Sequence, residues 1–312
     1  MKFIYKFSIY LLILFLNFIN VNSYENKILI KIDNHIITSI DLHNESNYLL
    51  ALNKNLENLG KTDLFKISKN SLIKDKIKTI ELSKYNQNIQ TDEKYISEII
   101  KSIYSNLNLD SYESFIKYLN KFGVSSEYLK KKLSIQLEWN NLIAAKYLKK
   151  IVIDIEEIKN DLKKDSSKNL KEYLLSEIVF DISPKETFKE KVEIIENDIE
   201  KKGFLNAVSI HSISNSASTN SGKIGWLNET SINKNIKELL DDLKIGNHTK
   251  PITVPGGFLI LKIEDIRIIE NENYDLNKKI KDTINIKRNE QLNNYSNIYF
   301  NKVKKDLKIY EN

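Results

Sequence analysis

Five of the eight glycines of this chain lie between Gly222 and Gly257, and this Gly-rich stretch constrains the fold more than any other feature. Its first part closes a polar loop, Ser212–Trp226 (SISNSASTNSGKIGW), and its last part, Lys250–Lys262 (KPITVPGGFLILK), contains a Gly-Gly pair. The runs on both sides of that pair are rich in β-branched and aromatic residues. This pattern predicts two strands joined by a tight hairpin.

The segments around this stretch show strand and helix patterns in turn. Within Glu172–Arg267 we predict strand Tyr173–Phe180, helix Lys185–Lys202, short helix Phe204–His211, the polar loop, helix Ile232–Leu243, and strands Thr249–Val254 and Phe258–Ile263. A few short strands with helices between them, and turns marked by glycine, indicate a small α+β domain.

Four motifs of this domain resemble the parvulin-type peptidyl-prolyl isomerases. They are LLSEIVF, SGKIGW, IKELLDDLKIGNHTKPI and GGFLILKI, which begin at Leu174, Ser221, Ile236 and Gly256. The resemblance implies a parvulin-like domain over 168–267, with a small antiparallel sheet flanked by helices.

The N-terminal segment Met1–Ser23 has the layout of a secretory signal peptide. Lys2 and Lys6 precede an apolar run, Phe7–Ile19, and small or polar residues follow it. The run is short for a membrane span, which needs about 20 apolar residues. Two interpretations stay open: a cleaved signal peptide, which sends the protein to the periplasm, and a retained inner-membrane anchor. The chain has no cysteine, which excludes disulfides and a lipid-modified N-terminal cysteine.

Residues 24–162 form the second part of the predicted architecture. Lys27–Ile37 predicts a hairpin with its turn at Asp33-Asn34, and apolar residues recur at helical spacing from Asp41 to Tyr147. These apolar stripes exceed what lone helices need, so we expect a shared core. Together with the secretory start, the helical region resembles the N-terminal domain of the SurA-type periplasmic chaperones.

Seven aromatic side chains of these helices allow two interpretations. Either they form a cradle for unfolded polypeptides, or they pack within the helical core. They are Tyr95, Tyr104, Phe115, Tyr118, Phe122, Tyr128 and Trp139.

The C-terminal residues 274–309 carry an apolar stripe without proline or glycine, which predicts one long helix, with a break near Asn293-Asn294 as one option. The polar segment Lys163–Leu170 marks the boundary before the parvulin-like domain. The resemblance to SurA-type proteins implies that the C-terminal helix packs on the N-terminal domain. Residues 24–162 and 274–309 would then form one folding unit, with the parvulin-like domain inserted between them.

Charge and hydropathy exclude two classes of protein. The formal net charge is +6, but acidic and basic residues alternate along the predicted helices, and no basic stripe with interleaved aromatics indicates nucleic-acid binding. The mean hydropathy of −0.40 argues against a protein with many membrane spans.

The chemistry of a parvulin concerns the amide bond before proline, whose isomerisation barrier is about 20 kcal/mol. The reaction needs no metal or nucleotide, so we expect no cofactor. Family parvulins place two histidines on adjacent strands, facing a Cys or Asp. Carried over onto this sequence, the histidine positions fall on Glu177 and Leu259, and the Cys/Asp position falls on Ser214. The resemblance therefore implies catalytic positions without the usual catalytic side chains.

The apolar floor that holds the proline ring in family parvulins is better preserved in this sequence than the catalytic positions are. The resemblance assigns it to Ile224, Ile232 and Ile236, and Phe258 joins them as a predicted substrate-binding residue. Ile236 replaces an aromatic side chain, which keeps an apolar wall but loses the flat face that stacks on proline. We expect a parvulin fold with weak or no isomerase activity.

The sequence thus supports three hypotheses about function. The first is an exported chaperone that binds unfolded outer-membrane or other exported polypeptides, with transient membrane contact and no nucleic-acid or metal partner. The second is an active prolyl isomerase whose pocket uses Ser214, Glu177 and the isoleucines. The third is a membrane-anchored foldase that resembles the PpiD type.

Overall fold

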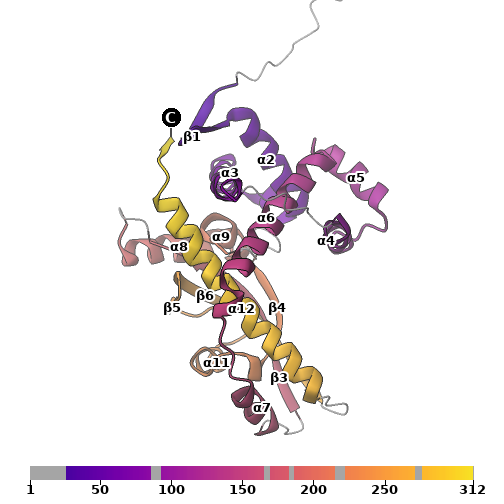
Figure 1. The fold of residues 1–312 in the computed structure, drawn as a ribbon, viewed down its shortest axis with the longest axis vertical. Helices are drawn as coiled ribbons and strands as arrows, with labels where there is room; N and C mark the ends of the chain where they lie inside the picture. Colours follow the sequence, from indigo (N-terminus) through magenta and orange to yellow (C-terminus); the bar gives the residue numbers. More distant parts are fainter. Residues whose placement is uncertain are drawn as a thin grey trace, which may run out of the picture.

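The computed structural model describes residues 26–85, 93–164, 169–182, 186–214, 222–270 and 276–311. The predicted signal peptide lies outside these residues. The described chain forms a group of helices and a small β-sheet, and one long C-terminal helix runs past both (Figure 1). The α+β fold class predicted from the sequence is confirmed.

The described part of the chain begins with a hairpin of β1 (Ile28–Ile32) and β2 (His35–Thr38), as predicted. Its turn places Asp33 at a φ of 48°, a conformation that short polar residues tolerate better than most. β7 (Ile309–Glu311) then pairs with β1, so the sheet order is β2-β1-β7 and the two ends of the described chain lie side by side. The sequence pattern extended the C-terminal helix over β7, which is wrong: the helix ends at Lys305.

Among the described residues, five α-helices follow the hairpin, in the region where the sequence predicts helices. Thr38 opens the first with a capping box, in which its backbone N–H donates to the carboxylate of Asp41 at 2.8 Å. Ser111 and Ser125 cap the last two. The helices are α2 (Ser39–Leu52), α3 (Lys61–Ser83), α4 (Glu93–Asn106), α5 (Tyr112–Lys121) and α6 (Ser126–Tyr147), with short 3-10 turns η1 (Lys54–Asn58) and η2 (Leu148–Lys150).

The long helix α12 (Leu276–Lys305) packs against α3, α6 and α7 (Ile155–Lys164). Its buried face adds Tyr299, Phe300 and Val303 to a core that surrounds Trp139 of α6. The helix is continuous, so the break that the sequence left as an option near Asn293-Asn294 is absent. Side chains from the two ends of the chain thus share one hydrophobic core.

The second sheet has four antiparallel strands in the order β4-β3-β6-β5. They are β3 (Asn169–Phe180), β4 (Lys223–Asn228), β5 (Ile252–Val254) and β6 (Gly257–Glu270). The predicted Gly-Gly hairpin is confirmed, since Val254 pairs with Gly257 across the turn. β4 corrects the sequence analysis, which assigned its first residues to the polar loop.

Helices cover both faces of this sheet. α8 (Phe188–Lys202) and α9 (Phe204–His211) pack on one face, where Ile178, Phe180 and Ile260 are buried. α11 (Lys234–Asp241) packs on the other face, against Leu175 and Ile263. A 3-10 turn, η3 (Glu229–Ser231), joins β4 to the segment that leads into α11.

Candidate functional site

Two of the predicted catalytic positions lie on the sheet face covered by α11. Between β3 and β6, Glu177 pairs with Leu261. Val179, two residues further along β3, pairs with Leu259. Side chains alternate between faces along a strand, so Glu177 shares the face of Leu175, and Leu259 shares the face of Leu261. The structure therefore brings these two positions together on adjacent strands.

The predicted apolar floor lies on the same face. Ile232, Ile236 and Leu259 are half-buried and pack against a core that includes Tyr173 and Leu240. Ile224 lies at a bulge in β4, between the pairs that β4 makes at Gly225 and Lys223, and it is 38% exposed. Because these side chains also fill the core beneath α11, their position alone does not distinguish packing from proline binding.

The third predicted catalytic position, Ser214, lies beside β3 and is buried. Its hydroxyl is 3.0 Å from that of Ser212, which in turn accepts a hydrogen bond from the backbone N–H of Val179 at 3.0 Å. The N–H of Ile213 donates to the Val179 carbonyl at 2.6 Å. Ser212 and Ser214 thus belong to the network that pairs this segment with β3.

Phe258 does not join the other predicted residues. It pairs with Phe180 and stacks on that ring at 5.4 Å, on the face covered by α8 and α9. The ring of Phe188 on α8 lies 4.7 Å away. The sequence analysis assigned Phe258 to substrate binding together with the isoleucines, but its side chain points away from that of Leu259, because adjacent strand residues point to opposite faces.

A polar network closes one end of the α11 face. The hydroxyl of Tyr173 donates to Asp241, and Lys171 and Lys237 contact the same carboxylate at 2.9 and 2.6 Å. Burial favours the neutral acid, but the hydrogen bonds from Lys237, Tyr173 and Lys171 outweigh it and lower the pKa of Asp241. These groups are already paired with one another, so they link β3 to α11.

Neither histidine of the domain lies with Glu177 and Leu259. His211 ends α9 and its Nε2 is 2.7 Å from the Asp198 carboxylate on α8. Burial lowers the pKa of His211 to about 4, although the hydrogen bond to Asp198 opposes the shift. The Nδ1 of His248 donates to the Thr249 carbonyl at 3.1 Å. On the α11 face, the two positions to which the sequence analysis assigns histidines in the family hold a carboxylate and a leucine, which cannot supply a ring N–H.

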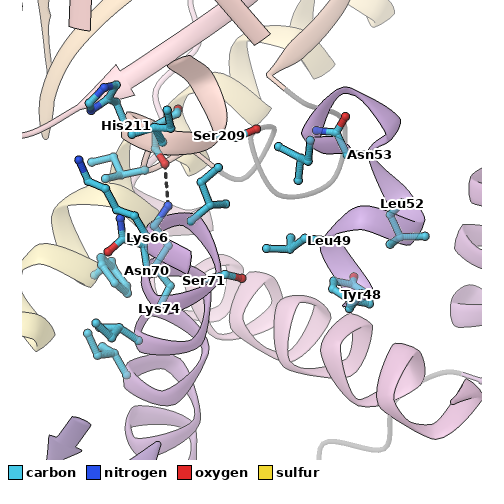
Figure 2. A pocket seen from close by; sticks show the side chains of 18 of the residues that line it. Tyr48, Leu49, Leu52, Asn53, Lys66, Asn70, Ser71, Lys74, Ser209 and His211 are labelled. Carbon is cyan, nitrogen blue, oxygen red and sulfur yellow. Dashed lines mark hydrogen bonds between the residues drawn. The ribbon is translucent and has the colours of Figure 1, made fainter. Parts of the chain in front are cut away.

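A cavity of about 870 Å³ lies between the helices and the sheet-containing part, and we call it the α2–α9 cavity (Figure 2). Residues of α2, α3 and α4 line one side, and α9 with the segment after it lines the other. Residues of α12 and β7 contribute as well. Its volume falls within the range of ligand pockets, about 300–1,000 Å³. None of the seven predicted site residues lines it.

Half-buried aliphatic side chains form much of the wall of this cavity. Leu49 and Leu52 come from α2, and Ile99 and Ile103 come from α4. They pack at the edge of the core that holds Phe115. Such side chains present apolar surface to the cavity while they remain anchored in the core, as expected of a surface that takes up apolar ligand groups.

Contacts between α3 and the α8–α9 pair hold the two sides of the cavity together. The Nζ of Lys74 donates to the Ser212 carbonyl at 2.6 Å, the dashed bond in Figure 2. Ile210 of α9 is buried against Leu56 and Ile67. A small apolar cluster and a charge-assisted hydrogen bond thus fix the cavity's width.

The sequence analysis did not predict this cavity. It also left open whether the aromatic residues of the helices bind polypeptides or pack within the core. Phe115 and Trp139 are fully buried, and Tyr104, Tyr118, Phe122 and Tyr128 pack against the same core as Phe115. None of the seven aromatics lines the cavity. Its walls come from segments far apart in sequence. The only sequence signal for them was the helical spacing of the aliphatic residues in α2 and α4.

Comparisons with known proteins find similarity to parvulin-type domains and to SurA chaperones. The Rotamase family model, a PPIC-type PPIase domain, matches residues 178–265. Chaperone SurA of Pseudomonas aeruginosa is 24% identical over 174 residues, which is 50% of this chain and 40% of that protein. Chaperone SurA of Pseudomonas putida is 38% identical over 58 residues, 18% of this chain and 14% of that protein.

A solved structure from the SurA-like chaperones PEB4 and Cj1289 of Campylobacter jejuni covers 92% of this chain and 99% of its own, with 14% identity and a TM-score of 0.36. The match to the Rotamase family model identifies residues 178–265 as a parvulin domain of the PPIC type. Half of the chain is similar in sequence to a SurA chaperone. It matches 40% or less of the length of the two SurA proteins. Within the described ranges, none of the helices combines the length and apolarity needed to span a bilayer.

Proposed function

We propose that this protein is an exported chaperone of the periplasm that binds unfolded outer-membrane or other exported polypeptides in the α2–α9 cavity. The observation that carries the proposal is the cavity itself, about 870 Å³ lined by half-buried aliphatic side chains between two parts of the chain. The names of the SurA relatives and the leader-like pattern of Met1–Ser23 support it.

The domain division belongs to this proposal. Residues 24–162 and 274–309 form the chaperone unit, and 168–267 form the inserted parvulin-like domain. The shared core of Trp139, Tyr299 and Phe300 supports the first unit, because it needs side chains from α6 and α12. A cavity that lies between the two parts lets a bound polypeptide touch both of them.

Site-specific photo-crosslinking tests the location of the binding site. A photoreactive amino acid replaces Leu52 or Ile103 in the cavity wall, and an equivalent replacement of the exposed Ile245 is the control. We expect an unfolded outer-membrane protein to crosslink at the two cavity positions and not at the control. Equal crosslinking at all three positions would contradict a defined site.

The parvulin-like domain has weak or no isomerase activity in this proposal. Glu177 and Leu259 lie where the family has histidines, and neither side chain can donate a ring N–H. The half-buried Ile232 and Ile236 favour the alternative, because they keep an apolar floor. An assay of cis/trans isomerisation in a short Xaa-Pro peptide decides between the two. A clear rate that Ile236→Ala abolishes would restore the enzyme hypothesis.

A further inference from the structure

The α2–α9 cavity has two ends of different chemistry. Figure 2 shows Tyr48, Leu49 and Leu52 together on the α2 side, while Lys66 and Lys74 lie on α3, near the end of α9. The apolar end suits hydrocarbon side chains, and the other end presents ammonium groups. A ligand that fills the whole cavity therefore meets both chemistries.

Lysines greatly outnumber carboxylates among the described residues that line the cavity. The lining includes six lysines, Lys54, Lys66, Lys74, Lys191, Lys223 and Lys304, and two carboxylates, Asp181 and Glu311. One of the two carboxylates is already neutralised, since Glu311 is 2.8 Å from the Nζ of Lys69, outside the cavity wall. The wall thus has an excess of positive charge.

Several of these lysines retain their charge for a ligand. Lys74 donates to a backbone carbonyl and makes no ion pair within the described ranges, although the charges of Asp181 and Asp75 act on it. Lys66 and Lys304 are exposed, and within the described ranges no carboxylate lies at ion-pair distance from either. Ammonium groups at the wall of a partly closed apolar cavity attract a carboxylate more strongly than the same groups in open solvent.

From this distribution we propose that the α2–α9 cavity selects polypeptide segments in which apolar side chains adjoin carboxylates. The inference rests on the proposed chaperone function and adds the class of segment that is bound. The apolar part of the segment lies against α2 and α4, and its carboxylates lie near Lys66, Lys74 and Lys304. Basic segments are repelled by the same lysines, so the cavity discriminates by charge.

The ionisation of Lys74 adds a dependence on pH. Burial, reinforced by the charge of Lys78, lowers the pKa of Lys74 to about 8. The preference for carboxylates should therefore decrease as the pH rises from 7 to 9. The charged and titratable groups around this site are Lys66, Asp75, Lys78, Asp181, Lys191, His211, Lys304 and Glu311.

Fluorescence anisotropy with three matched peptides tests the selection. The peptides have one length and the same apolar residues, and they differ only in carrying Glu, Gln or Lys at the remaining positions. We expect the order of affinity Glu, then Gln, then Lys, and a smaller spread at high salt. A fourth peptide, the Gln sequence with an amidated instead of a free C-terminus, distinguishes the terminal carboxylate from acidic side chains as the group that is bound.

Charge-reversal variants locate the effect. Lys66→Glu and Lys304→Glu should each weaken binding of the Glu peptide by about two- to fivefold, and weaken binding of the Gln peptide less. Lys131→Glu, an exposed position of α6 outside the cavity, is the matched control. Equal affinity for the Glu, Gln and Lys peptides would overturn the charge selection, although the chaperone proposal would survive. Failure of every peptide to bind would reject both.

Discussion

The indole N–H of Trp139 donates a hydrogen bond at 2.8 Å to the hydroxyl of Ser296, and the two residues lie 157 positions apart. Both are buried, and they join α6 to α12. A buried donor that loses its acceptor retains the cost of leaving water, about 1–3 kcal/mol. This contact therefore reports directly on whether the two ends of the chain form one folding unit.

Ser296→Ala should lower the free energy of unfolding by about 1–3 kcal/mol, because it leaves the Trp139 N–H without an acceptor. Urea denaturation monitored by tryptophan fluorescence measures the change. Ser97→Ala is the control, since Ser97 is exposed and its hydroxyl bonds to the Glu93 carbonyl within α4. Equal stability of both variants and the wild type would argue against a shared core.

Gly257→Ala should destabilise the parvulin-like domain. A Cβ at this position would lie 2.3 Å from the carbonyl oxygen of Phe180, so β6 has to move away from β3. Overpacking of this kind costs about 1–3 kcal/mol. Gly60→Ala serves as the control, because a Cβ there meets no atom within 4 Å. Calorimetry should show a lower unfolding temperature for the first variant alone.

The stability of the protein should fall as the pH decreases from about 6.5 to about 4, with His211 as one source. Burial lowers the pKa of His211 to about 4 in the folded state, from an ordinary value of 6.5. Between these values the unfolded chain binds a proton at His211 and the folded chain does not, so acid favours unfolding. The stabilisation from the neutral ring is complete above pH 6.5. The expected loss is about 3 kcal/mol.

The pH effect is isolated by comparison with His211→Asn, which does not titrate. The difference in unfolding free energy between wild type and variant should change across this pH window. The groups that face the ring are Lys66, Lys191, Asp198 and Lys202. The pKa of Asp198 is itself lowered: burial opposes this, but hydrogen bonds from Lys202 and His211 prevail. The stabilisation that the ionised Asp198 contributes is therefore lost at a lower pH. A constant difference would contradict the assignment to His211.

Local sequence patterns predicted the elements whose signals lie within a few residues. The hairpin at Asp33 and the turn at Gly257 follow from the backbone conformations that these residues favour. α9 was predicted with its observed ends, Phe204 and His211, and Gly203 separates it from α8.

Features that depend on pairing between distant segments were not predicted. β7 is three residues long and forms only because β1 lies beside it. β4 follows a polar loop and contains Gly225, so its local pattern does not indicate a strand. Likewise, the sequence analysis assigned Phe258 to substrate binding without a strand register, and the pairing of β6 with β3 puts it opposite Phe180, on the face covered by α8 and α9.

The candidate site was predictable only where a family resemblance supplied positions. That resemblance placed Glu177 and Leu259 on adjacent strands, and the register puts them on one face of the sheet. Their roles, and those of Ser214 and the isoleucines, stay predictions. The α2–α9 cavity had no counterpart in the sequence, because Leu52, Ile103 and Ile210 belong to different parts of the chain.

The most direct measurement of the central claim is suppression of aggregation of an unfolded outer-membrane β-barrel protein. The double variant Leu52→Gln/Ile103→Gln places two amides in the apolar wall of the cavity, and Ile245→Gln makes the same exchange at an exposed position outside it. We predict that wild type and Ile245→Gln suppress aggregation equally, while the double variant, folded by circular dichroism, loses most of the effect. Full suppression by a folded double variant would contradict a binding site in the α2–α9 cavity.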